Sequence, residues 1–156
     1  MFKVEVVMNN VESLFFHNHE FNSYKFMGCK LKIKNGKKGA EFSVWAPNAK
    51  EVRVVGDFNN WDGCNNLMKS INNSGYWNIF ISDITQGDIY KYEIITKQQI
   101  SILKSDPYAY FSELRPNTAA VVTNLENYHW NDEKWMRNRE DNRPYELPLN
   151  IYMKYN

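Results

Sequence analysis

Between residues 30 and 122 the sequence repeatedly alternates apolar and polar residues with a period of two, in short stretches that turn residues separate at near-regular spacing. This alternation is typical of β-strands with one buried face, and no stretch with helical periodicity lies between them. About seven such strands predict an all-β domain, an antiparallel β-sandwich of roughly 90 to 100 residues. The immunoglobulin-like class fits this pattern first, and a small closed barrel is the alternative.

A hairpin is the clearest local signal. Residues 30–34 and 40–45 alternate on either side of a turn over residues 35–39, which begins with Asn-Gly. A second hairpin is expected where residues 96–99 join two further alternating stretches. The remaining strands are expected at 51–56, 75–81, 88–95, 100–104 and 119–122.

The two ends of the chain differ in composition from this central part, so we expect short helical flanks around the sandwich. Residues 1–28 form an aromatic-rich lead-in, with a short strand over 2–8 and a weakly signalled helix over 11–16. The sandwich is expected over 29–130, and a helix with a polar linker over 131–147, with Asn131 as the helix N-cap. Residues 148–156 resemble the first strand of a further domain, and we expect the chain to stop where that domain begins.

Composition limits the possible ligands and scaffolds. The 156 residues are too few for a (β/α)8 barrel, which needs about 250. Lys and Arg number 19 against 18 Asp and Glu, and this balance disfavours a nucleic acid or an anionic membrane as the main partner. The 5 Trp, 10 Tyr and 9 Phe exceed what a core of this size usually needs, so some are expected to form a flat surface suited to a sugar.

No cofactor or metal is expected. Cys29 and Cys64 lack a CxxC spacing and are expected to be buried free thiols, while His17 and His19 are expected to be surface or packing residues. The N-terminus lacks the features of a signal peptide, and no apolar run reaches the ~20 residues of a membrane span. We therefore expect a cytoplasmic protein.

The segment over residues 54–63, VVGDFNNWDG, carries the strongest site signal. It places Trp61 in a loop after a strand, where an indole can pack on the C–H face of a sugar ring while Asn and Asp side chains bond to its hydroxyls. In the alternative interpretation, Trp61 covers one end of the sandwich and the Asn residues close an Asx turn. Asp57 and Asp62 could form the acid/base pair of a glycoside hydrolase, but their place in a turn favours a structural role.

Five motifs in order support a resemblance. FSVWAPNA (42–49), VGDFNNW (55–61), GYW (75–77), GDIYKYEI (87–94) and KSDPYA (104–109) make residues 39–130 similar to the family 48 carbohydrate-binding module. The resemblance implies an immunoglobulin-like fold that holds α-glucan. It implies Trp61 as the sugar-stacking indole, Lys91 as the basic residue beside it, and Asn60 as a neighbour of both. Residues 98–100 are Gln-Gln-Ile, where glycogen-binding members of the family carry a second Trp.

The flanks look like those of 1,4-α-glucan branching enzymes. The similar segments are LFFH (14–17), YKFMG (24–28), RPNTA (115–119), YHWND (128–132) and PLNIY (148–152). The resemblance implies an N-terminal module whose partners are glycogen or maltooligosaccharide and the enzyme's own catalytic barrel. It also implies no catalytic residue in this chain, which should be inactive alone. The alternative is a docking domain that packs on the barrel without binding sugar.

Overall fold

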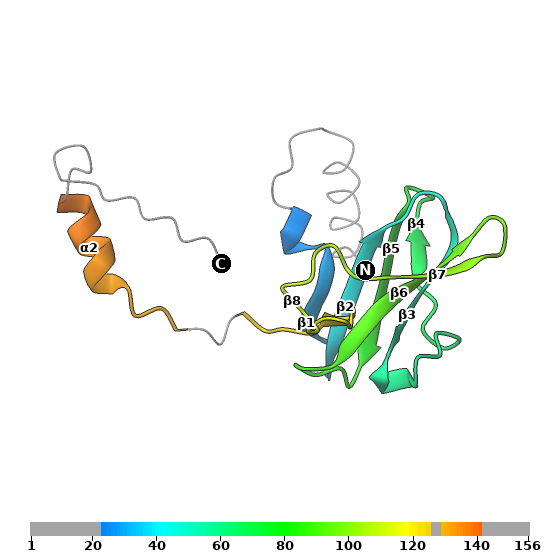
Figure 1. Ribbon diagram of the computed structural model, residues 1–156, viewed down its shortest axis with the longest axis horizontal. Coiled ribbons are helices and arrows are strands. Elements are labelled where there is room, and N and C mark those ends of the chain that lie inside the picture. Colours follow the sequence, from blue (N-terminus) through cyan, green and yellow to red (C-terminus); the bar gives the residue numbers. More distant parts are fainter. Residues whose placement is uncertain (1–22, 126–128, 142–156) are drawn as a thin grey trace. The chain divides into compact units, whose positions relative to one another are not determined.

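The computed structural model describes residues 23–125 and 129–141, and Figure 1 shows its elements. The chain divides into two compact units, Met1–Asn124 and Leu125–Asn156. The strand and helix expected within residues 1–16, the linker over 142–147 and the strand-like segment over 148–156 lie outside the described residues. None of the described helices is both long and apolar enough to span a membrane.

The first unit is a sandwich of two antiparallel sheets, as the alternation predicted. Its first sheet has the strand order β1-β2-β5-β4, with bounds Gly28–Lys34, Lys37–Trp45, Tyr76–Ser82 and Lys69–Ile71. The second sheet has the order β3-β6-β9-β8, with bounds Ala49–Gly56, Ile89–Thr96, Ala120–Val121 and Phe111–Ser112. Strand β7 (Ser101–Lys104) also pairs with β6, and the 3-10 helices are η1 (Ser23–Lys25) and η2 (Asp57–Asn59).

The core lies between the two sheets and is built from every second residue of the long strands. The Phe42 ring of β2 meets the Tyr90 ring of β6 edge-on, with centroids 5.0 Å apart. Val52 and Val54 of β3 are fully buried beside them. Burying a side chain of this size contributes about 1.5–3 kcal/mol, so these positions dominate the stability of the sandwich.

Asp106 is a buried acid within the motif over residues 104–109. Its Oδ2 accepts hydrogen bonds from the hydroxyls of Tyr90 at 2.5 Å and Tyr92 at 3.3 Å, and its Oδ1 accepts one from the Tyr108 amide at 2.8 Å. Burial raises the pKa of Asp106 above its ordinary value and also raises the pKa of Tyr90 and Tyr92, so both hydroxyls stay protonated and donate. This cluster joins β6 to the segment after β7.

The structure differs from the prediction at several boundaries. The first hairpin turn is tighter, because Asn35 and Gly36 both have left-handed backbone (φ 52° and 78°) and Lys37 already belongs to β2. Strands β4 and β8 were not predicted. The second unit contains helix α2 (Glu133–Asp141), which begins two residues after the expected cap at Asn131.

Candidate functional site

The segment from Gly56 to Asp62 leaves the end of β3 through η2 and then turns sharply. Asn60 and Trp61 both have left-handed backbone, with φ of 52° and 60°. Asn tolerates this conformation, whereas a bulky Trp rarely adopts it unless its surroundings impose it. Here the Trp61 amide donates to the Gly56 carbonyl at 2.9 Å and the Asp62 amide donates to the Asn59 carbonyl at 3.0 Å. These bonds hold Trp61 in its strained conformation.

The indole of Trp61 is both exposed and fixed. The residue is 38% exposed, and its Nε1 donates a hydrogen bond to Asp57 Oδ1 at 2.8 Å. A ring that is already oriented loses little conformational freedom when a flat ligand packs on it. Trp61 is therefore a preorganised aromatic surface at the end of β3.

Asn59 and Asn60 have different roles although they are neighbours. The Asn59 side chain accepts from the Gly56 amide at 2.9 Å and donates to the Val54 carbonyl at 2.9 Å and to Asn66 Oδ1 at 2.8 Å. Asn59 thus braces the turn, as the Asx-turn interpretation expected of the asparagines. Asn60 is exposed, and it is the residue before Trp61. Its backbone amide, not its side chain, donates to the Asp57 carbonyl at 3.2 Å.

Lys91 lies on β6 and points away from the core, because it alternates with the buried Tyr90 and Tyr92. Its register partner on β3 is Val55, and the next pair is Gly56 with Tyr90. Since Trp61 is bonded to Gly56, Lys91 and the turn share one end of the second sheet. The Lys91 ammonium donates to Thr118 Oγ1 at 2.8 Å, and among the described residues the cation–π contacts do not include Lys91 with Trp61.

Two residues that sequence reasoning did not select as binding residues complete the arrangement. Asp57 orients the indole, and its position four residues before Trp61 within the motif is a signal that could have been used. Thr118 orients Lys91 from 27 residues away, and no local pattern points to it.

Asp57 and Asp62 both make structural hydrogen bonds, as the turn interpretation expected. Asp57 accepts from the indole, and Asp62 Oδ1 accepts from the Cys64 amide at 2.9 Å. The Cys64 hydrogen bonds lower the pKa of Asp62, whereas an acid catalyst needs a raised pKa.

The prediction of a buried thiol was wrong for Cys64, which is exposed because it lies in the loop after η2. Cys29 is half-buried, and burial raises its pKa to about 12. Within residues 23–125 and 129–141, no three His, Cys, Asp or Glu side chains gather closely enough to hold a metal ion.

Residues 26–109 match the family model of carbohydrate-binding module 48, the isoamylase N-terminal domain. The chain belongs to this family. Strands β1 to β7 and the motif that carries Trp61 lie within the matched part, whereas β8 and β9 of the sandwich follow it. Lys91 lies within it as well.

The module and its flanks are similar to the N-terminal part of 1,4-alpha-glucan branching enzymes GlgB. The chain is 48% identical over 151 residues to the enzyme of Geobacillus stearothermophilus, covering 96% of this chain and 24% of the relative. It is 52% identical over 139 residues to that of Halothermothrix orenii, covering 89% and 22%. The chain thus spans about a quarter of the length of these relatives.

Solved structures share the fold of the module at low sequence identity. The pullulanase from Bacillus acidopullulyticus has a TM-score of 0.54 at 21% identity, covering 72% of this chain and 13% of that one. Klebsiella pneumoniae pullulanase complexed with maltotriose has a TM-score of 0.50 at 21% identity, covering 67% and 10%. These likenesses support the sandwich fold.

Proposed function

We propose that this module is the N-terminal α-glucan-binding and positioning part of a longer enzyme similar to 1,4-α-glucan branching enzymes. The observation that carries the proposal is the Trp61 indole, which is exposed and held by Asp57 at the end of a module 48 sandwich. The ligand is an α-glucan such as glycogen or a maltooligosaccharide.

Binding would rest on one aromatic surface and two polar side chains. The C–H face of a glucose ring packs on Trp61, while Asn60 and Lys91 bond to its hydroxyls. Residues 98–100 supply no second indole, and this single platform fits weak binding. We expect a dissociation constant in the millimolar to high micromolar range, or about 4 to 6 kcal/mol.

The reaction itself belongs to the longer enzyme. The relatives are named as enzymes that branch 1,4-α-glucan. From the family resemblance we propose that the longer enzyme cuts an α-1,4 linkage, transfers the fragment to a 6-hydroxyl of glycogen and works in the cytoplasm. From the family resemblance, we expect the catalytic carboxylates to lie in a catalytic barrel and not in this module. The module alone should therefore leave amylose unbranched, with its contribution limited to holding glucan near a catalytic barrel.

A titration of the full 156-residue chain with maltoheptaose, followed by calorimetry and intrinsic fluorescence, tests the proposal. Trp61→Ala should weaken binding at least tenfold. Trp45→Ala is the matched control, because Trp45 is also exposed (55%) but lies on the first sheet. Equal affinities for wild type and Trp61→Ala would contradict the binding role of this indole.

A docking domain that never binds sugar is the second candidate function. It is favoured by two exposed apolar side chains, Phe111 of β8 at 58% and Leu114 just after this strand at 85%. Such residues on an isolated module suit a contact with another domain. This candidate predicts that Phe111→Ser with Leu114→Ser reduces self-association of the chain and that maltoheptaose causes no heat at any concentration.

A further inference from the structure

The loop that carries Trp61 rests on the outer face of β3 at Gly63, which is buried although the residues on either side of it are exposed. A Cβ at this position would lie 2.8 Å from Arg53 Cβ and 3.1 Å from both Arg53 Cδ and Val55 Cγ1, which is too close for any side chain. Gly63 does not have left-handed backbone, so the close approach alone requires glycine. Val55 is the register partner of Lys91, and alternation places Arg53 on the same face.

The Arg53 side chain is itself held in place. Its Nη2 donates to Glu51 Oε2 at 3.0 Å, and its Nη1 lies 3.6 Å from Glu93 Oε2. Glu93 is the register partner of Arg53 on β6, and its Oε1 accepts from the Ser101 hydroxyl at 2.8 Å. The returning part of the loop pairs with the same residue, because Leu67 forms a β-bridge with Arg53. These partly exposed ion pairs add little stability, but they restrict where the aliphatic stem of Arg53 can lie.

The loop has an anchor on each side of Gly63. Before it, the Trp61 amide is bonded to the end of β3. After it, the Asn66 carbonyl accepts from the β3 backbone at 3.1 Å, and the Asn66 amide donates to the Gly63 carbonyl at 2.9 Å. Between these anchors, the contact with Arg53 sets the distance of the loop from the outer face of β3. Because Trp61 is only two residues away, a displacement of Gly63 moves the indole relative to Lys91.

We propose that Arg53 and Gly63 are positioning residues of the glucan site. The aliphatic stem of Arg53 supports the Gly63 backbone, and the ion pairs with Glu51 and Glu93 hold that stem. Neither residue contacts the sugar, and both act through the position of the Trp61 indole. This role rests on the proposed glucan binding by Trp61, but the position of the loop can be measured without sugar.

The indole N–H resonance of Trp61 in the sugar-free full chain reports the position of the loop. Gly63→Ala adds a Cβ that does not fit, and Arg53→Ala removes the supporting stem, so both should shift this resonance. Arg53→Lys keeps Cβ, Cδ and a positive charge and should restore the wild-type resonance. Asn65→Ala removes an exposed side chain of the same loop and is the matched control, which should leave the resonance in place.

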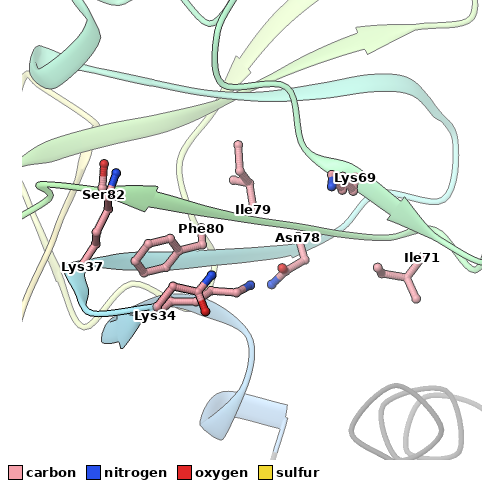
Figure 2. Close-up of a pocket in the computed structure, with 9 residues that line it drawn as sticks. Lys34, Lys37, Lys69, Ile71, Asn78, Ile79, Phe80 and Ser82 are labelled. Carbon is pink, nitrogen blue, oxygen red and sulfur yellow. The ribbon is translucent and has the colours of Figure 1, made fainter. Parts of the chain in front are cut away.

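Calorimetric titration of the same variants with maltoheptaose measures the effect on binding. Gly63→Ala and Arg53→Ala should each weaken binding about fivefold or more, and the two losses should not add in the double variant, because both remove one contact. Arg53→Lys and Asn65→Ala should bind within about twofold of wild type, since additive sites without shared partners do not couple. A second control lies on the first sheet, where a pocket of about 500 Å³ opens on the outer face and Figure 2 shows Phe80 among the side chains that line it. Phe80→Leu should change neither the Trp61 resonance nor the affinity.

The proposal is overturned if Gly63→Ala and Arg53→Ala keep the wild-type Trp61 resonance, if Arg53→Lys fails to restore it, or if both alanine variants bind maltoheptaose like wild type. Should Gly63→Ala fail to fold, Arg53→Ala and Arg53→Lys decide the question by themselves. If the wild-type chain does not bind maltoheptaose, the proposed glucan function fails. The resonance of the sugar-free chain then still decides whether Arg53 and Gly63 position the loop.

Discussion

At the residue scale, the hydrogen bond from the Trp61 indole to Asp57 matters most for the proposed glucan binding, because it orients an exposed ring. An exposed indole without this bond could rotate, and a ligand would have to restrict that motion at a cost in affinity. The left-handed backbone at Trp61 also indicates a fixed position, because the hydrogen bonds of the turn maintain this strained conformation.

Replacing Asp57 tests this role. Asp57→Ala removes the acceptor, and we expect maltoheptaose affinity to fall about three- to tenfold, since a net hydrogen bond contributes about 0.5–1.5 kcal/mol. Asp57→Asn keeps an acceptor oxygen and should bind within about twofold of wild type. Calorimetric titration of the three proteins measures the effect. Equal weakening by both variants would show that the carboxylate charge, not the orientation of the indole, is what counts.

Asp106 makes the stability of the sandwich depend on pH. Because burial raises its pKa in the folded state above the ordinary value of 3.8, the folded chain binds this proton more tightly than the unfolded chain. The free energy of unfolding contributed by this group is therefore greatest below pH 3.8 and falls as the pH rises through the folded pKa.

Urea unfolding of wild type and Asp106→Asn at a series of pH values isolates this contribution. The asparagine cannot titrate, so the stability of wild type relative to the variant should decrease as the pH rises above 3.8. A relative stability that increases with pH would mean that the tyrosine hydrogen bonds outweigh burial and lower the pKa of Asp106.

At the scale of elements, the turn after β3 depends on one side chain. Asn59 makes three hydrogen bonds that join the end of β3 to the loop carrying Asn66. Asn59→Ala should lower the free energy of unfolding by about 2–3 kcal/mol and also weaken glucan binding. The exposed neighbour Asn65 is the control, and Asn65→Ala should change stability by less than about 0.5 kcal/mol in chemical denaturation. Similar losses in the two variants would refute the bracing role.

The elements also show what sequence reasoning can and cannot reach. Alternation predicted the strand over 88–95, and on it Tyr90 and Tyr92 are buried while Lys91 faces outward, because a strand with one buried face imposes a period of two. Strands β4 and β8 have three and two residues, which are too few to show a period. They form because they pair with the edges of β5 and β9. Asp106 and Thr118 likewise act on residues 14 to 27 positions away, and no local pattern reveals such contacts.

At the scale of the whole molecule, the two sheets carry different surfaces. The second sheet presents Trp61, Asn60 and Lys91 at the end of β3, whereas the outer face of the first sheet carries Lys34, Lys37 and Lys69 as well as Phe80. The near-zero net charge of +1 hides this asymmetry, because acids and bases balance over the chain but not over each face. A ligand preference is therefore decided by a face and not by overall composition.

The most direct test of the central claim is a titration of the full chain with maltoheptaose, observed through the indole N–H resonance of Trp61. Five tryptophans give separate indole signals, so the ring that meets sugar can be identified. We expect the Trp61 indole and the amides of Asn60 and Lys91 to shift in proportion to one binding curve, while the Trp45 indole stays in place. Saturating maltoheptaose that leaves the Trp61 indole unshifted would contradict the account.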